Sequence, residues 1–204
     1  MSLVFYTAPN SSASPVSSAL FELNVPHERV VFDLAKNEQR SPQFLALNPN
    51  GKVPTLIVDG TPMFEALAIL NYLGDSYGVE RELWPAPSTP EHLTARSWST
   101  WAYVSYGTNL TTLHACASLS AKEQLAPLAA LAHSRLTELL DILEARLSGQ
   151  PFMLGDKYSL LDLIVGSVVG YGTWLGASVE GHPHVKEWVA SFQARPSYSL
   201  GLKA

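Results

Sequence analysis

The sequence predicts an α/β domain followed by an all-α domain, and two observations carry this prediction. Strand and helix patterns alternate over the first ~75 residues, whereas no strand pattern follows residue 90. A connector at residues 74–90 separates the two parts and contains prolines at positions 85, 87 and 90. A chain of 204 residues is long enough for one or two compact domains. We therefore expect one domain at residues 1–77 and a second at residues 90–204.

The first part begins with a short apolar strand at residues 3–6, followed by a helix. Ser14 is expected as its N-cap and Pro15 as its first helical residue, because both residue types favour these positions. A second strand is predicted at residues 28–32 and a short helix at residues 42–47. The first helix is amphipathic, with one apolar face made by Val16, Ala19, Leu20 and Leu23.

A β-hairpin follows at residues 54–64, and a further helix with Leu67, Leu70 and Leu73 on one face ends this part. The resulting order is βαβ, then αββα, which is the thioredoxin-like arrangement of layers. Its third strand starts unusually, because Pro54 has no N–H to donate to a strand ladder.

The second part contains only helical patterns, which predicts a helical bundle. One long helix is expected at residues 91–117, and two more at residues 159–175 and 184–193. Between them, a leucine-rich seam predicts another helix, through Leu125, Leu128, Ala132, Leu136, Leu139 and Leu143.

The composition excludes several classes of protein. A net charge of -5 and a pI near 5.6 argue against nucleic-acid binding, because phosphates need a basic surface. The N-terminus lacks a basic signal-peptide region, and no apolar stretch reaches the ~18 residues of a membrane span. Cys116 is the only cysteine, which excludes an intrachain disulfide and a thiolate-rich zinc site. We expect a cytoplasmic protein without a bound metal.

Two neighbouring stretches suggest a site for a small peptide. A cis Val53–Pro54 bond would turn the backbone N–H and C=O of Val53 outward, where they can pair with a ligand backbone. Glu65 and Ala66 open the helix after the hairpin, where N–H groups attract a carboxylate and Glu65 can bind an ammonium group. The alternatives are an ordinary structural turn at Pro54 and a helix-dipole role for Glu65.

These stretches carry a resemblance to a known family. "NPNGKVPTL" at residues 48–56, followed by "FEALAILNYL" at residues 64–73, resembles the glutathione-site signature of the cytosolic glutathione transferases. The usual signature has Glu-Ser where this chain has Glu65-Ala66. "GDKYSLLDLIVGSVV" at residues 155–169 resembles the family's capping-box helix, with Ser159 as N-cap and Asp162 at N3. "HPHVKEWVASFQARP" at residues 182–196 resembles its closing helix.

The resemblance implies a fold, an activity and a glutathione site. The fold would be a thioredoxin-like domain followed by an all-helical domain, in a homodimer. The activity would be conjugation of the glutathione thiolate to a small hydrophobic electrophile, or reduction of disulfides or peroxides, with glutathione as cosubstrate. Pro54 would be cis and Val53 would pair with the cysteinyl unit, while Glu65 and the Ala66 N–H would hold the γ-glutamyl end. Lys52 would bind the glycyl carboxylate.

The stretch "YTAPNSSASP" at residues 6–15 is expected to activate the thiol. It resembles the "SSCS" run of zeta-class and the "ACSLSP" run of beta-class transferases, which puts Ser11 at the catalytic position and Ala13 in place of the zeta cysteine. Ser12 is the neighbouring candidate, and Tyr6 is the alternative used by tyrosine-type enzymes. A hydroxyl here would donate a hydrogen bond to the glutathione sulfur and favour its thiolate.

A second substrate is expected against the long helix of the helical domain. Tyr103, Tyr106 and Leu110 share one face of this helix, although aromatic residues at helical spacing also commonly form a core.

Two other functions stay open, and the class within the family is beta-, nu- or zeta-like. One is a glutathione-dependent isomerase; the other is a non-catalytic binding or regulatory protein, which the missing hydroxyl at Ala66 favours.

Overall fold

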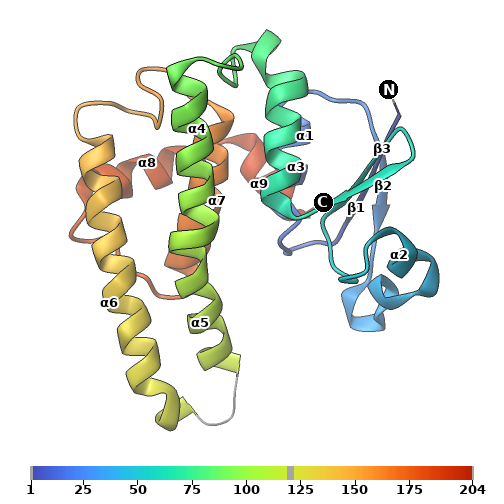
Figure 1. Ribbon diagram of the computed structural model, residues 1–204. Helices are drawn as coiled ribbons and strands as arrows, with labels where there is room; N and C mark the ends of the chain where they lie inside the picture. The colour runs from blue at the N-terminus through green and yellow to red at the C-terminus, as the bar shows by residue number, and fades with distance from the viewer. Residues whose placement is uncertain (1, 119–121, 204) are drawn as a thin grey trace. The chain divides into compact units, whose positions relative to one another are not determined.

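The computed structural model describes residues 2–118 and 122–203, and the chain folds into two compact units. Residues 1–87 and 194–204 form the first unit, and residues 88–193 form the second (Figure 1). The predicted fold class is confirmed: the first unit is thioredoxin-like and the second is helical. The grouping differs from the expected boundaries at the C-terminus, because residues 194–204 pack with the first unit rather than with the helical one.

A mixed four-stranded sheet lies at the centre of the first unit, in the order β2-β1-β3-β4. The first two strands are parallel, and the other two neighbouring pairs are antiparallel, with Tyr6 opposite Thr55 in the central pair. The parallel pair requires a crossover, which the first helix supplies. The strands are β1 (Leu3–Thr7), β2 (Glu28–Val31), β3 (Thr55–Val58) and β4 (Thr61–Phe64).

Side chains of β1 alternate between the two faces of the sheet, as strand geometry requires. Leu3, Phe5 and Thr7 are buried, whereas Tyr6 lies on the opposite face and contacts the ring of Phe44, with centroids 5.2 Å apart. Helix α2 therefore packs on the Tyr6 face. The helices of this unit are α1 (Ser14–Glu22), α2 (Pro42–Leu47), α3 (Ala66–Leu73) and α9 (Pro196–Lys203).

The expected N-cap of α1 is wrong by one residue. Ala13 occupies the N-cap position and Ser14 is already helical, with a buried hydroxyl that has no partner among the described residues. The Ser11 hydroxyl accepts a hydrogen bond from the Ala13 N–H at 3.1 Å, so the polar contact at this helix start comes from farther upstream.

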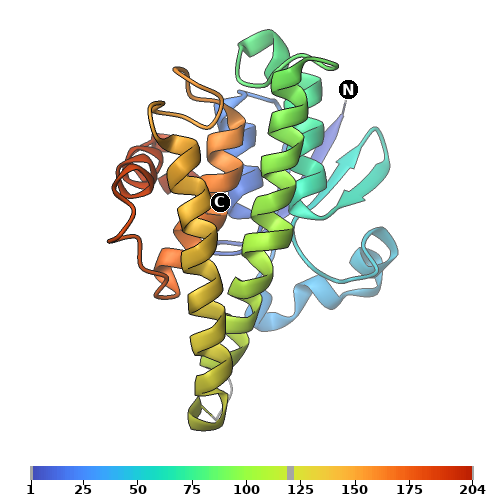
Figure 2. The same ribbon diagram turned by 60° about the vertical axis from the view of Figure 1, so that its left-hand side comes forward.

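The helical unit contains the predicted long helix with one irregularity. Residues 90–118 are helical throughout, but a π-helical segment, η5 (Ala102–Tyr106), separates α4 (Pro90–Trp101) from α5 (Gly107–Ser118). Figure 2 shows α5 beside the long helix α6 (Lys122–Leu147), which it contacts. Helices α7 (Leu160–Trp174) and α8 (Pro183–Gln193) complete the unit.

Asp162 ties three segments of the helical unit together. Its buried carboxylate accepts hydrogen bonds from the Met153 N–H at 2.8 Å and from the Ser159 N–H, the Ser159 hydroxyl and the Trp188 indole, each at 2.9 Å. Burial raises the pKa of Asp162, and these donors oppose the rise. The predicted capping box is thereby confirmed. Within the described part of the chain, no helix is long and apolar enough to cross a membrane.

Candidate glutathione site

The loop before β3 carries the sharpest predicted feature, a cis Val53–Pro54 peptide bond, and the structure confirms it. Val53 lies just before β3, outside the strand ladder. Its carbonyl accepts a hydrogen bond from the Ser12 hydroxyl at 2.9 Å. Its N–H has no hydrogen-bond partner within residues 2–118 and 122–203. The Val53 N–H is therefore available to a ligand. The Val53 carbonyl is bonded to the Ser12 hydroxyl, which a ligand donor can replace.

Asn48 fixes the shape of this loop and was not identified from the sequence. Its buried side-chain amide donates to the Lys52 carbonyl at 2.8 Å and to the Thr55 hydroxyl at 2.9 Å. Its side-chain oxygen accepts from the Asn50 N–H at 3.0 Å. A single side chain thus bonds two backbone groups before Val53–Pro54 and the Thr55 hydroxyl after it. An asparagine six residues before a strand-opening proline was the available signal.

Arg40 supports the same loop from outside. Its guanidinium donates to the Asn50 carbonyl at 3.1 Å, and a Cβ atom at Gly51 would lie only 2.8 Å from Arg40 Nη1. Gly51 has φ +57, so it combines a left-handed backbone with a close approach that a larger residue would block. Lys52, the candidate for the glycyl carboxylate, is exposed beside it.

The two candidate serines have different environments. The Ser11 hydroxyl donates to the Ala8 carbonyl at 2.6 Å and accepts from the Ala13 N–H, so both of its roles are used within its own loop. Ser12 is exposed, and its hydroxyl reaches across to Val53. Of the two, Ser12 is the one in direct contact with the backbone group expected to pair with a ligand.

Tyr6 packs among aromatic side chains of the first unit. Its ring packs against Phe32, with centroids 5.6 Å apart, and against Phe44. Phe32 and Phe44 also contact one another edge to face, at 4.8 Å. Tyr6 therefore belongs to an aromatic cluster that joins β1 to α2.

Glu65 and Ala66 stand at the start of α3, as the sequence predicts. Glu65 occupies the N-cap position with φ +72, its side chain is exposed, and its carbonyl accepts the Ile69 N–H at 3.1 Å. Positive φ at a glutamate is uncommon and is concentrated at functional positions. Ala66 is buried at the first helical turn, where backbone N–H groups attract an anion.

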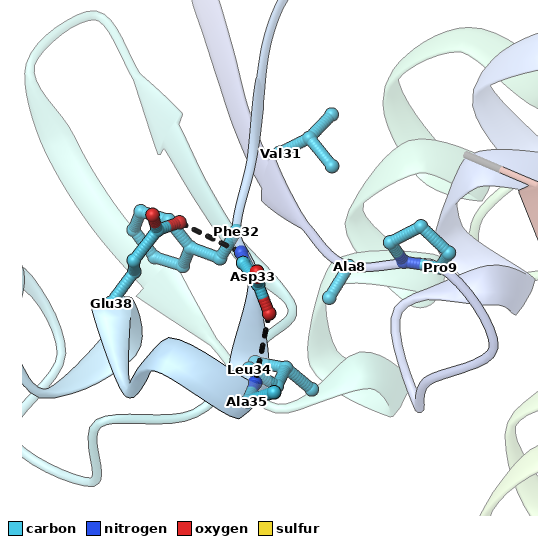
Figure 3. A pocket seen from close by; sticks show the side chains of 8 residues that line it. All are labelled: Ala8, Pro9, Val31, Phe32, Asp33, Leu34, Ala35 and Glu38. Atoms are coloured by element: carbon cyan, nitrogen blue, oxygen red, sulfur yellow. Dashed lines mark hydrogen bonds between the residues drawn. The ribbon is translucent and has the colours of Figure 1, made fainter.

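An open hollow with a cavity volume of about 610 Å³ lies next to the serine loop. Figure 3 shows Ala8 and Pro9 on one side and the segment from Phe32 to Ala35 on the other. The Asp33 carboxylate accepts the Ala35 N–H at 3.0 Å and forms an ion pair with Lys36, which lowers the pKa of Asp33. Asp33 and Glu38 are the two charged residues of the lining, and the other six lining residues are apolar.

The three residues expected at the second-substrate surface differ in exposure. Tyr106 and Leu110 are buried in the helical unit, and a Cβ atom at Gly172 would lie 2.7 Å from the Tyr106 hydroxyl. Burial raises the pKa of Tyr106. Tyr106 and Leu110 therefore pack in the core of the helical unit. Of the three residues, only Tyr103 is partly exposed. Among the described residues, no three histidine, cysteine or acidic side chains form a group that could hold a metal ion.

Family models match both parts of the chain. Residues 1–75 match the glutathione S-transferase N-terminal domain, and residues 100–196 match its C-terminal domain. Glutathione S-transferase F10 of Arabidopsis thaliana is 30% identical over 172 residues, covering 80% of this chain and 77% of the relative. The disulfide-bond oxidoreductase YfcG of Escherichia coli is 29% identical over 206 residues, covering 97% and 93%.

Solved structures agree with this assignment. A glutathione transferase of Burkholderia graminis, crystallised with two glutathione molecules per subunit, is 30% identical, with a TM-score of 0.84 over 98% of this chain and 87% of its own. The transferase Ure2p8 of Phanerochaete chrysosporium, crystallised with oxidised glutathione, is 26% identical, with a TM-score of 0.85 over 98% and 92%. Fold and loop geometry together define a thioredoxin-like protein with an appended helical unit. The chain belongs to the cytosolic glutathione transferase superfamily.

Proposed function

We propose that this protein binds glutathione along the loop at Val53 and directs its thiolate at a small hydrophobic electrophile. The observation that carries the proposal is the backbone of Val53, whose N–H is available and whose carbonyl is held by the Ser12 hydroxyl. An extended peptide can pair with such groups as an added strand. The Burkholderia graminis and Phanerochaete chrysosporium transferases, each crystallised with glutathione or its disulfide, support the choice of ligand.

The ends of glutathione find complementary groups on either side of this loop. The cysteinyl unit pairs with Val53, and the γ-glutamyl ammonium group binds the exposed Glu65 carboxylate. The γ-glutamyl carboxylate accepts the N–H of Ala66, at the positive end of the α3 dipole. Lys52 holds the glycyl carboxylate.

Thiol activation follows from an exchange of hydrogen bonds at Val53. When the cysteinyl N–H donates to the Val53 carbonyl, it replaces the Ser12 hydroxyl, which then donates to the glutathione sulfur. This bond favours the thiolate over the thiol. Lowering a thiol pKa by ~2 units corresponds to about 2.7 kcal/mol of differential stabilisation. Ser11 holds the loop through Ala8 and Ala13 and is the alternative donor.

The second substrate binds in the apolar hollow at Pro9 and Leu34, beside the serine loop. There the thiolate attacks an electrophilic carbon and forms a thioether, and the leaving group departs with the bonding electron pair. Tyr103, partly exposed on the helical unit, stays a proposed second-substrate residue. We further propose a cytoplasmic homodimer with a role in detoxification.

Disulfide reduction is the second candidate activity, favoured by the similarity to a disulfide-bond oxidoreductase. Cys116 is a buried residue of the helical unit, so no protein thiol stands at the serine loop. Glutathione then supplies both thiols. One thiolate attacks the disulfide and releases a thiolate, and a second glutathione resolves the mixed disulfide, yielding glutathione disulfide and two reduced thiols.

Calorimetric titration with glutathione tests the proposal most directly. We expect saturable binding that is weakened about tenfold by Glu65→Gln and unchanged by Glu138→Gln, a matched change at an exposed glutamate of α6. Turnover with an aryl halide and with a small disulfide then separates the two activities. Absence of binding to the wild-type protein would favour a glutathione-independent binding or regulatory role.

A further inference from the structure

The C-terminal helix α9 lies against α1 at very short range. A Cβ atom at Gly201 would be 2.0 Å from the Ser18 hydroxyl oxygen and 2.7 Å from the Ser14 carbonyl oxygen. No side chain fits at this point of contact, so the glycine sets how closely the two helices approach. The Ser18 hydroxyl also donates to the Ser197 carbonyl at 2.9 Å.

A network of charged and polar groups anchors the start of α9. The Glu22 carboxylate, whose side chain is 9% exposed, accepts two bonds from the Arg195 guanidinium, both at 2.7 Å. It also accepts the Ser197 hydroxyl at 2.6 Å. Paired hydrogen bonds of this kind restrict both distance and orientation. The helix is therefore held at its first turn and at Gly201.

The other end of α9 reaches the serine loop. The Leu202 carbonyl, in the last turn of the helix, accepts a hydrogen bond from the Asn10 N–H at 3.0 Å. Asn10 has φ +50 and directly precedes Ser11 and Ser12. The last turn of a helix leaves carbonyl groups without intrahelical donors, so Leu202 is a natural acceptor. The conformation of the loop thus depends on a residue at the far end of the chain.

We propose that α9 positions the serine loop for thiol activation, with Gly201 and Leu202 as positioning residues that act through Asn10. The inference rests on the proposed function, because it assigns the loop's hydroxyls to the glutathione sulfur. If α9 is displaced from α1, the Leu202 carbonyl leaves Asn10, and the loop loses the contact that fixes its left-handed turn. The activating hydroxyl of the serine loop then spends less time within hydrogen-bond distance of the glutathione sulfur. Binding through Val53 and Glu65 is preserved.

Two variants disrupt the contact between α9 and the serine loop in different ways. Gly201→Ala places a methyl group against the Ser18 hydroxyl and the Ser14 carbonyl, and deletion of residues 202–204 removes the acceptor itself. For both we expect the pKa of bound glutathione to rise by about 0.5 to 1 unit, which lowers the thiolate fraction and kcat at pH 7 by about threefold to tenfold. The KM for glutathione should stay within about twofold of wild type, and kcat should recover at high pH.

Two controls separate positioning from general loss of stability. Leu200→Ala alters an exposed residue of α9, and Val25→Ala opens a cavity in the first unit away from the loop. Both should keep the wild-type pH profile even where the melting temperature falls. Amide hydrogen exchange at Asn10 supplies a readout that does not depend on activity, and it should accelerate in both α9 variants.

The outcomes are distinct. If wild-type protein fails to bind glutathione, the proposed function fails. If wild-type protein binds and activates glutathione but both α9 variants keep its bound-thiol pKa, the positioning role is overturned. An equal pKa shift in Val25→Ala also overturns it, because the effect would then be one of stability alone.

Discussion

The Ser12 hydroxyl donates a hydrogen bond of 2.9 Å to the Val53 carbonyl, and this bond joins segments 41 residues apart in the chain. It links the loop after β1 to the cis-proline loop before β3. The Val53 carbonyl can exchange the Ser12 hydroxyl for another donor. The residue that follows, Pro54, has no N–H of its own to donate. A ligand amide arriving at Val53 therefore changes what Ser12 can bind.

We expect Ser12→Ala to raise the pKa of bound glutathione while leaving its affinity intact. In the proposed complex the hydroxyl acts on the sulfur, whereas Val53, Glu65 and Ala66 supply binding common to the ground and transition states. Turnover at neutral pH should fall and should recover as the pH rises and the thiol ionises unaided. The measurement is a pH titration of thiolate absorbance in the complex, alongside turnover with an aryl halide.

Ser11→Ala is the matched control for this experiment. It should lower thermal stability, because it removes the contacts with Ala8 and Ala13, and shift the bound-thiol pKa less than Ser12→Ala does. A larger pKa shift in Ser11→Ala, or in Tyr6→Phe, than in Ser12→Ala would reassign the activating group to that residue.

Ala66→Ser should tighten glutathione binding. The added hydroxyl at the first turn of α3 can donate to the γ-glutamyl carboxylate, and a hydrogen bond to a charged group contributes about 1.5–3 kcal/mol. We expect the dissociation constant from calorimetry to fall about tenfold. Ala66→Val, which adds bulk without a donor, should weaken binding. An unchanged constant in Ala66→Ser would place the carboxylate elsewhere.

Substitutions at Glu65 should move affinity and stability in different directions. Glu65→Gln removes the charge that we propose binds the ammonium group, so it should raise the dissociation constant about tenfold, with no change in melting temperature. Glu65→Gly should weaken binding similarly but raise the melting temperature by about 2–4 °C, because glycine adopts the observed φ of +72 without strain. A lower melting temperature in Glu65→Gly would contradict the assignment of strain.

Asp162→Asn should destabilise the helical unit. The carboxylate accepts bonds from four donors, and an amide in its place directs an NH₂ group at one or more of them. We expect a loss of about 3 kcal/mol in the free energy of unfolding, measured by denaturant titration. Asp156→Asn, at an exposed residue just before α7, should be neutral.

The proposed homodimer predicts a species of twice the 22.2 kDa chain mass in light scattering. Leu93 and Val104, on α4 and the π-helical segment after it, are 66% and 60% exposed, which marks an apolar surface available to a second copy. Leu93→Glu should shift the protein toward the monomer. Ile142→Glu, at a 50% exposed position of α6, should not. A monomer at micromolar wild-type concentration would contradict this prediction.

Local patterns accounted for most of the fold. Helix α2 has the predicted bounds, and β1, β2 and the hairpin differ from prediction by one residue at most, because periodicity and turn residues are local signals. Helix α9 was not predicted. Its sequence, "PSYSLGLK", contains two serines and a glycine, so its helical structure depends on packing against α1.

At the candidate site, too, local features could be predicted from the sequence and contacts between distant segments could not. Val53–Pro54 and Glu65–Ala66 were found because their roles belong to the backbone of short motifs. The contacts of Ser12 with Val53 and of Asn10 with Leu202 join distant segments, so no local pattern reveals them. Periodicity left both core packing and a substrate surface open for Tyr106, and the choice depends on its close approach to Gly172 on another helix.

The unit that is synthesised first is the last to be complete. Residues 194–204 belong to it, whereas the helical unit between them and residue 87 is continuous in sequence. On the ribosome, the helical unit can therefore fold before its N-terminal neighbour has all its parts, a reversal of the usual N-to-C order. Until Arg195 emerges, the Glu22 carboxylate lacks its guanidinium partner. Likewise, the Asn10 N–H of the serine loop lacks its acceptor until Leu202 has been synthesised.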